Sequence, residues 1–279
     1  MADSGTVDRD GFKLEWAREG TGIPMMVLGA RHFYPRYFPS SLRERFEIAF
    51  CDLRQWVPTP LGFDIGTITL DTFSEDVDAL RRAVGFDRPI VAGQAQHGSM
   101  ALEYARHSPE NVGGVVAIAP LPPAGSREGL EPAQEFFRRD ADAGRLAAHD
   151  RKSAARPAPA PVATTQDFVA SYLADDAQRW YDYTFDASAL WEGVEANIPM
   201  MEAVFGPAVL GGFRIDRLDV PVFLALGRYD YRFPYYVWEG QMERFSNLRY
   251  ELYQKSGHNP PYEQPDEFTA DLVEWAESL

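Results

Sequence analysis

Short apolar runs alternate with amphipathic segments along most of the chain. A continuous apolar run is typical of a strand buried on both faces of a parallel sheet, whereas strict alternation of apolar and polar residues indicates a strand at an edge. These patterns predict strands at 12–18, 24–28, 46–52, 90–92, 113–119, 220–226 and 248–253. The alternation at 12–18 predicts an edge strand of an antiparallel hairpin.

Helices are expected between these strands. Apolar residues recur with helical spacing from 69 to 84, and Gly85 ends that pattern. Further helical segments are predicted at 41–46, 100–105, 238–245 and 265–275, the last with a proline near its first turn. Alternating strands and helices predict an α/β fold, in which helices cover both faces of a mostly parallel sheet.

The pattern changes between the apolar runs at 113–119 and 220–226. Residues 122–217 are rich in Ala, Arg, Asp and aromatic residues and show no strand pattern. Helical stretches are predicted there at 131–148, 165–173 and 189–204, with a stiff polyproline-like connector at Arg156–Pro161. We interpret 122–217 as a helical cap over the sheet, inserted into a core that consists of residues 1–121 and 218–279.

Charge and cysteine content narrow the class of partner. The chain has 279 residues and a formal net charge of −15, so nucleic acids and anionic membranes are not expected as partners, because phosphate binding needs a basic face. The single cysteine, Cys51, rules out an internal disulfide and suits a reducing cytoplasm. We find no secretory signal and no apolar run long enough to cross a bilayer. A cytoplasmic monomer or homodimer that acts on a small molecule is expected.

The candidate chemistry is centred on the turn after the run at 90–92. A strand, a tight turn at Gly93 and a helix form the frame of a nucleophile elbow, where the motif G-x-S-x-G holds a serine on a strained turn above a sheet. The central position here is Ala95, whose methyl group cannot attack a carbonyl. Asp230 follows the strand at 220–226, and His258 lies in the loop before the last helix. This chain order of elbow, acid and base suits a triad in which the imidazole takes the nucleophile's proton and the carboxylate fixes the imidazole tautomer.

The sequence resembles the α/β-hydrolase superfamily, and most closely its proline-iminopeptidase-like branch, over nearly the whole chain outside the cap. The matching segments are Gly29, Asp52–Arg54, Gly93–Gly98, Met100–Ala105, Gly227–Asp230 and Ser256–His258. The resemblance implies that Ala95 stands in the place of the serine, with Asp230 as the acid and His258 as the base.

The same resemblance implies an oxyanion hole formed by the backbone amides of Gln96 and Ala30. Leu28–Arg31 departs from the His-Gly-Gly loop that the family often has, and Gln55 departs from the usual Asp-x-Arg-Gly. No cofactor is implied. Neither metal-ligand spacing nor a Gly-rich phosphate loop is found, so no metal is expected.

Three interpretations of Ala95 are open. In the preferred one, the natural residue is serine and the chain is a Ser→Ala variant that holds substrate without turnover, because an acid and a base for activating a nucleophile are present. In the second, the protein is a natural homologue that binds a ligand without catalysis. In the third, His258 is the general base of a reaction without a nucleophile, and the oxyanion hole stabilises an enolate. The first predicts a hydrolase of an ester, lactone or amide bond in a medium-sized, largely apolar substrate.

Other side chains are candidates for substrate binding. His97 either orients the substrate or packs beside its strand, and we prefer packing. Arg31 and His32 face either the pocket or solvent. Glu192 and Glu195 either capture a substrate amine, as acidic groups do in iminopeptidase lids, or form a solvated helix face. Five aromatic residues of the cap either line the pocket or form the core of the cap: Trp180, Tyr181, Tyr183, Phe185 and Trp191.

Overall fold

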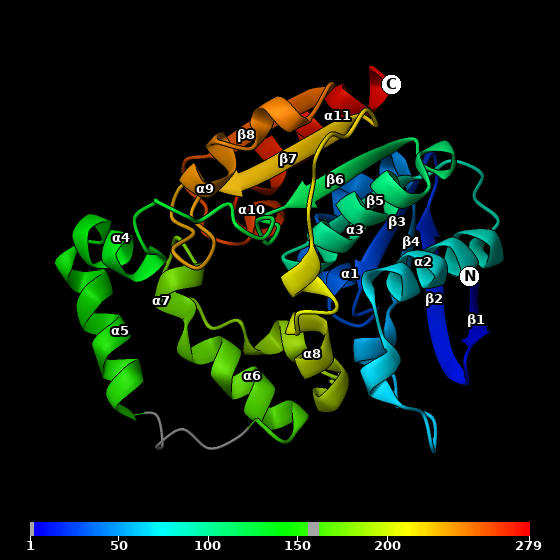
Figure 1. Cartoon of the computed structure of the whole chain (residues 1–279). Helices are drawn as coiled ribbons and strands as arrows, with labels where there is room; N and C mark the ends of the chain where they lie inside the picture. Colours follow the sequence, from blue (N-terminus) through cyan, green and yellow to red (C-terminus); the bar gives the residue numbers. More distant parts are fainter. Residues whose placement is uncertain (1–2, 156–161) are drawn as a thin grey trace.

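The computed structural model of the chain describes residues 3–155 and 162–279 (Figure 1). Its strands form one sheet with the order β1-β2-β4-β3-β5-β6-β7-β8. The strands are β1 (Asp3–Arg9), β2 (Phe12–Gly20), β3 (Ile23–Gly29), β4 (Phe46–Asp52), β5 (Ile90–Gln94), β6 (Gly114–Ile118), β7 (Val222–Gly227) and β8 (Leu248–Tyr253). Only β1–β2 and β2–β4 pair antiparallel within this sheet. The predicted mostly parallel α/β architecture is confirmed, while the expected connector at Arg156–Pro161 lies outside the described residues.

Helices cover both faces of the sheet. Figure 1 shows α2 and α3 on one face and α11 on the other. The α-helices are α1 (Tyr34–Tyr37), α2 (Leu70–Val84), α3 (Gln96–His107), α4 (Ala133–Asp140), α5 (Ala143–Ala155), α6 (Thr165–Ala174), α7 (Asp176–Arg179), α8 (Ile198–Phe205), α9 (Tyr236–Glu239), α10 (Pro260–Glu263) and α11 (Pro265–Glu277). Short 3-10 segments lie at Ser40–Glu44, Arg54–Trp56, Ile65–Thr67, Pro109–Asn111, Ser188–Trp191, Leu210–Gly212 and Met242–Arg244.

The amino-terminal hairpin corrects one prediction. β2 is not an edge strand, because β1 pairs along its outer side with Val7 opposite Leu14. Asp10 and Gly11 join the two strands with φ values of 54° and 86°. Two central residues with positive φ are the mark of a type I′ hairpin turn, for which Asp-Gly is a preferred sequence. Apolar periodicity missed β1 because none of its residues is fully buried.

Most predicted helices of the cap and two of the core are shorter than the apolar pattern predicts. Of the two in the core, 41–46 forms only the 3-10 turn Ser40–Glu44. The segment 131–148 divides into α4 and α5, because the carboxylate of Asp142 accepts the N–H of Arg145 at 2.9 Å and begins a new helix. In 189–204 the α-helix begins only at α8, where the Asn197 side chain caps the first turn. The segment 238–245 holds the end of α9, which stops before Gly240, and a 3-10 turn. The prediction at 165–173 agrees with α6.

The sheet brings the candidate residues together at one end. Every residue of β5, β6 and β7 is buried, in agreement with the apolar runs. Parallel strands present their carboxyl ends at the same edge, which is where ligands bind in sheets of this kind. The helices α4 to α8 lie between β6 and β7 in the chain and extend beyond these carboxyl ends (Figure 1). The loops after β3, β4, β5, β7 and β8 therefore meet beneath a helical cap.

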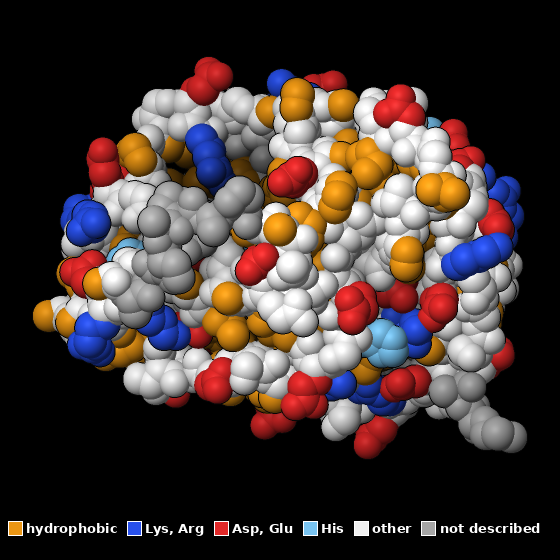
Figure 2. All heavy atoms as spheres, turned by 90° about the horizontal axis from the view of Figure 1, so that it is seen from below, with side chains coloured by type: hydrophobic (Ala, Val, Ile, Leu, Met, Phe, Trp, Pro, Cys, Tyr) orange, Lys and Arg blue, Asp and Glu red, His pale blue; other side chains and the backbone are white. Residues whose placement is uncertain are grey.

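The outer face of the cap carries mixed charge. Seen from the side of α5, α6 and α8, acidic and basic side chains lie interspersed among apolar ones (Figure 2). Within the described ranges, no helix is both long and apolar enough to cross a membrane.

Candidate active site

A strained turn joins β5 to α3. Ala95 has φ 50° and ψ −123°, a backbone conformation that costs free energy in any residue with a Cβ atom. The turn is fixed because Ala95 N–H donates to Ile118 O at 2.9 Å, and Ala95 O accepts the N–H of Gly98 at 3.0 Å. A Cβ atom at Gly93 would lie 2.3 Å from the carbonyl of His97, so only glycine fits there. This is the strand–turn–helix geometry of a nucleophile elbow, with a methyl group at its tip.

His258 and Asp230 form a buried pair in the loops after β8 and β7. His258 Nδ1 lies 2.6 Å from Asp230 Oδ2, and both residues are 1% exposed. The other carboxylate oxygen, Oδ1, accepts the backbone N–H groups of Arg232 and Phe233 at 2.9 Å each. These donors hold the carboxylate ready to accept a hydrogen bond from the Nδ1–H group of the imidazole. Nε2 is then the ring nitrogen that can accept a proton from a reacting group.

The loop that carries His258 is held by the elbow, the cap and its own helix. Gln94 Nε2, next to the elbow, donates to His258 O at 2.9 Å. His258 N–H donates to Arg179 O of the cap at 2.5 Å, and a Cβ atom at Gly257 would lie 2.2 Å from that oxygen. The Glu263 carboxylate accepts the N–H of Gly257 at 2.8 Å. The position of the imidazole therefore depends on the cap as well as on the sheet.

The loop after β3 leaves Ala30 beside the elbow. Gly29 has φ 131°, and a Cβ atom there would lie 2.4 Å from the Tyr34 ring and 2.8 Å from the His97 ring. The N–H of the next residue but one, Arg31, donates to Asp52 Oδ1 at 2.7 Å. The Arg31 amide is thus engaged away from the elbow, whereas Ala30 and Phe33 of this loop border the same cavity as Ala95.

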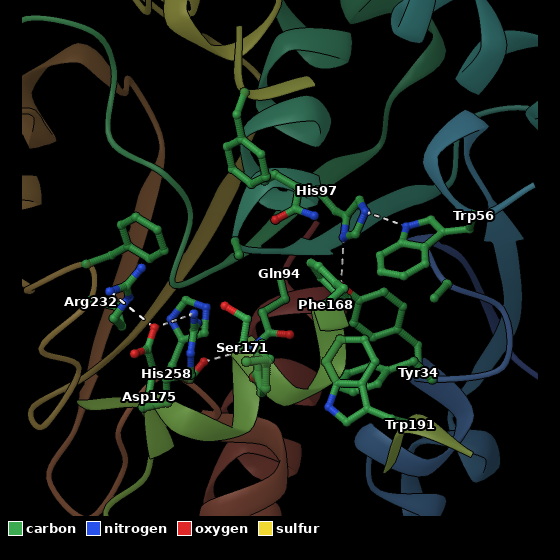
Figure 3. A pocket seen from close by; sticks show the side chains of 18 residues that line it. Tyr34, Trp56, Gln94, His97, Phe168, Ser171, Asp175, Trp191, Arg232 and His258 are labelled. Atoms are coloured by element: carbon green, nitrogen blue, oxygen red, sulfur yellow. Dashed lines mark hydrogen bonds and ion pairs between the residues drawn. The ribbon is translucent and has the colours of Figure 1, made fainter. Parts of the chain in front are cut away.

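Elbow, base and cap enclose one cavity of about 210 Å³. Its lining consists of Ala30, Phe33, Tyr34, Trp56, Gln94, Ala95, Gln96, His97, Phe168, Ser171, Tyr172, Asp175, Arg179, Trp191, Phe205, Arg232, Phe233 and His258. Asp230 lies behind His258. Figure 3 shows two flanks: Arg232, Asp175 and His258 gather on one side, and the rings of Tyr34, Trp56, Phe168 and Trp191 on the other. We call these the charged flank and the aromatic flank.

A second buried imidazole, His97, belongs to the aromatic flank. Trp56 Nε1, which can only donate, lies 3.0 Å from His97 Nε2, so Nε2 must be the acceptor and the ring proton resides on Nδ1. Nδ1 then donates to the Tyr34 hydroxyl oxygen at 2.8 Å. Burial lowers the pKa of His97 to about 3, so the ring stays neutral. His97 is therefore buried beside its strand, as in the preferred interpretation, with side chains rather than a backbone carbonyl as partners. A direct role in orienting the substrate stays a prediction.

Two positions at which family motifs often have glycine meet at this imidazole. His97 occupies the fifth position of the elbow motif, where G-x-S-x-G has glycine. Gln55 stands where the family usually has the glycine of Asp-x-Arg-Gly. The Gln55 amide nitrogen lies 3.0 Å from His97 Nε2, and both side chains are buried. The imidazole of His97 is therefore accommodated by Gln55, whose side-chain amide can hydrogen-bond to it.

Two predicted substrate-binding residues lie outside this cavity, next to the oxyanion loop. Arg31 and His32 line a second cavity of about 850 Å³ together with Glu195. The Arg31 guanidinium is paired with Asp52 at 3.2 Å and with Glu15. This pairing, rather than substrate, accounts for its position.

The aromatic residues of the cap divide between the two alternatives. Trp191 lines the main cavity and lies 6.4 Å, centroid to centroid, from Trp56. Trp180 and Tyr183 do not line it. Trp180 is buried against Phe185 at 4.7 Å, and the Tyr183 ring lies 4.9 Å from the Arg145 guanidinium. Both belong to the internal packing of the cap.

Sequence reasoning missed the cavity-lining face of α6 and α7. Phe168, Tyr172, Asp175 and Arg179 are spaced by four, three and four residues, and all four line the cavity. This spacing places side chains on one face of a helix and was present in the sequence as a signal. Arg232 and the phenylalanine after it could have been found from their proximity to the predicted acid. Among residues 3–155 and 162–279, no group of three His, Cys, Asp or Glu side chains could hold a metal ion.

The strained elbow, the buried His–Asp pair at the carboxyl ends of parallel strands and the overlying cap together define an α/β-hydrolase. A family model described as "alpha/beta hydrolase fold" matches residues 28–265, and the chain belongs to this family. It is 29% identical to the AB hydrolase superfamily protein YclE of Bacillus subtilis (strain 168) over 99% of both chains.

Solved structures agree with this fold. An alpha/beta fold family hydrolase from Bacillus anthracis str. Sterne superimposes with a TM-score of 0.71 at 14% identity, covering 99% of both chains. A proline iminopeptidase from Mycobacterium smegmatis gives a TM-score of 0.67 at 19% identity, with 99% of this chain and 98% of the other covered. At these identities the likeness concerns the fold alone.

Proposed function

We propose that this site is that of a serine-type hydrolase for ester, lactone or amide bonds, and that it lacks only the nucleophile, whose place Ala95 occupies. The observation that carries the proposal is the shared cavity: the methyl of Ala95, the imidazole of His258 and the two residues of the implied oxyanion hole, Ala30 and Gln96, all border it. A carboxylate held by two backbone amides and the imidazole is arranged for activating a nucleophile. As written, the chain would bind substrate without forming an acyl-enzyme.

With a serine at position 95, each group has a defined step. The serine hydroxyl gives its proton to His258 Nε2 while its oxygen attacks the substrate carbonyl. The amides of Ala30 and Gln96 hold the resulting oxyanion, and Asp230 stabilises the imidazolium. Collapse of the intermediate expels the alcohol or amine, which takes the proton from His258. Water, deprotonated by His258 in turn, then hydrolyses the acyl-enzyme and releases the acid.

The size of the cavity limits the group that the site can enclose. Pockets for drug-sized ligands usually have about 300–1,000 Å³. A cavity of about 210 Å³ suits a short acyl group better than the medium-sized substrate expected from the sequence. The rings of the aromatic flank offer it an apolar wall.

Covalent labelling of the Ala95→Ser variant tests the proposal independently of the natural substrate. We expect an alkyl fluorophosphonate to modify A95S stoichiometrically at position 95 and to leave the Ala95 chain unmodified, as read by intact-protein mass spectrometry. A95S/H258A should remain unlabelled, because its serine has no base. A folded A95S protein that is neither labelled nor active on p-nitrophenyl esters would contradict the proposal.

A second candidate is a reaction without a nucleophile, or ligand binding alone. It is favoured by the completeness of the His258–Asp230 geometry in a chain that carries Ala95. In this case His258 of the Ala95 chain itself would remove a proton from a substrate carbon next to a carbonyl. Exchange of deuterium from D2O into the α-carbon of methyl phenylacetate, followed by NMR, would support the reaction if H258A abolished it.

Two expectations from the sequence stay predictions. A cytoplasmic location follows from the cysteine usage and can be tested by cell fractionation. The expected oligomeric state is a monomer or a homodimer, and light scattering of the purified protein can distinguish the two. A small molecule, and not nucleic acid or a membrane, remains the expected partner.

A further inference from the structure

The charged flank holds more positive charge than its own carboxylates neutralise. Arg179 of α7 and Arg232 after β7 both line the cavity, and the carboxylate between them there is Asp175. Asp175 Oδ2 lies 3.3 Å from Arg232 Nη1 and 3.7 Å from Arg179 Nη2. These distances are long for charge-assisted hydrogen bonds, which are usually about 2.7–2.9 Å. One carboxylate is thus shared loosely by two guanidinium groups.

The two guanidinium groups are also only partly paired within the protein. The Nε atoms of Arg179 and Arg232 are buried, and neither has a hydrogen-bond partner among the described residues. The Arg179 guanidinium lies 4.2 Å from the centroid of the Tyr172 ring, which stabilises the cation beside the aromatic face. Its position is therefore set before any ligand arrives.

The surroundings make this flank electropositive within an acidic protein. Burial lowers the pKa of Arg232, and the nearby positive charges of Arg179 and Arg127 lower it further, against the opposing effect of Asp175 and Asp230. At the cavity wall two guanidinium groups, those of Arg179 and Arg232, share the one carboxylate of Asp175, because Asp230 is committed to His258. The chain as a whole has a net charge of −15, so this pairing of two cations with one anion is opposite in sign to the rest of the molecule. An added anion would relieve the repulsion between the two arginines.

We propose that the cavity takes a substrate with a free carboxylate, which Arg179 and Arg232 bind while the remaining part extends past Ala95 toward the aromatic flank. A guanidinium matches a carboxylate in shape and charge through paired N–H donors. The small cavity favours a short half-ester, that is, a dicarboxylic acid with one carboxyl group esterified. This names a substrate class for the proposed hydrolase and rests on that function, although the binding itself requires no turnover.

Binding to the Ala95 chain tests the proposal directly. Monomethyl succinate and dimethyl succinate share a carbon skeleton and differ in one charge. By calorimetry we expect the half-ester to bind about tenfold or more tightly than the diester. R179Q and R232Q should each reduce this preference to near unity, whereas R214Q, which removes an arginine from an exposed position outside the cavity, should leave it unchanged.

Asp175→Asn separates anion binding from a structural role. It removes the competing carboxylate, so the preference for the half-ester should increase in D175N while it decreases in R232Q. Lower half-ester affinity in R179Q, R232Q and D175N alike would show a structural effect and overturn the proposal. Equal binding of the two esters to the parent, or no detectable binding of the half-ester, would also overturn it. If the preference persists while A95S resists the fluorophosphonate, the hydrolase proposal fails and the anion site stands.

Discussion

Two buried imidazoles lie on opposite flanks of one cavity and have opposite surroundings. His258 on the charged flank is hydrogen-bonded to the carboxylate of Asp230. His97 on the aromatic flank contacts an indole, a phenol and an amide, which are all neutral. Burial alone disfavours a charged imidazole, and a nearby negative group offsets that cost. The two imidazoles therefore differ in their partners and not in residue type.

The two flanks also differ in the elements that form them and in the roles that we assign to them. The charged flank is built from the loops after β7 and β8 and from the segment where α6 meets α7, and it holds the groups to which we assign proton transfer and anion binding. The aromatic flank is built from the segments after β3 and β4 and from Phe168 and Trp191 of the cap. There His97 fixes Tyr34 and Trp56 through directed hydrogen bonds. We therefore assign the reacting groups to the charged flank, and the shape of the cavity to the aromatic flank.

The largest expected effect comes from substituting each of the two histidines separately in the A95S variant. In A95S, His258→Ala should lower kcat for p-nitrophenyl acetate by about 10³-fold or more, because the serine loses its base. His97→Gln should lower kcat by less than about tenfold, because His97 orients side chains and does not receive the proton. Stopped-flow or steady-state kinetics of the two double variants gives both values.

The control for this comparison is Asp230→Asn in the same background. Asparagine keeps the shape but offers its amide or carbonyl in place of the carboxylate, and we expect a decrease in kcat of about 10²–10⁴-fold. An A95S/H97Q variant as inactive as A95S/H258A, with unchanged circular dichroism, would show that the aromatic flank takes part in proton transfer.

A smaller effect concerns stability against acid. In the folded protein the pKa of His97 is about 3, and in the unfolded chain a histidine protonates near 6.5. Between these values the unfolded state binds more protons, so the His97 contribution to the free energy of unfolding is lost as pH falls from 6.5 toward 3. Its slope is at most about 1.4 kcal/mol per pH unit. Urea unfolding at several pH values should show a shallower acid loss in His97→Gln.

Comparing the variant with the parent removes the contributions of other groups. Burial raises the pKa of Glu263 from 4.5 to about 7, so its contribution has the opposite sign and decreases as pH rises through that range. It is present in both proteins and cancels in the difference. His107→Gln, which changes an exposed histidine, is the matched control. Equal pH slopes for H97Q and the parent would mean that His97 binds its proton over the same pH range in the folded and unfolded states.

The two flanks also differ in how far the sequence reveals them. Ala95, Asp230 and His258 could be named because each follows a predicted strand, and the carboxyl ends of parallel strands meet at one edge. Gln94, which joins the elbow to the His258 loop, and Tyr34, which reaches His97 from 63 positions away in the chain, carry no such signal. Their roles depend on side-chain contacts that form only when the loops have folded together.

The cap was the least predictable part. Its outline between β6 and β7 followed from the missing strand pattern, but helix ends were set by single capping residues such as Asp142 and Asn197. The assignment of Trp180 to the pocket failed because a buried aromatic residue of a core and one of a cavity wall have the same sequence pattern. The helical spacing from Phe168 to Arg179, by contrast, is visible in the sequence and indicates that these residues share one face.

The smallest effect isolates the elbow from both flanks. Ala95 has φ 50°, which glycine adopts without steric cost. Ala95→Gly should therefore raise the free energy of unfolding by about 0.5–1 kcal/mol. The relief of strain is partly offset by the greater entropy of glycine in the unfolded chain. Ala92→Gly, three residues earlier in β5 and fully buried, is the matched control and should destabilise, because glycine weakens a strand interior. Urea denaturation of both variants measures the difference. Destabilisation of A95G as large as that of A92G would show that the turn at Ala95 is not strained, and the strained elbow that orients position 95 toward the base would have to be abandoned.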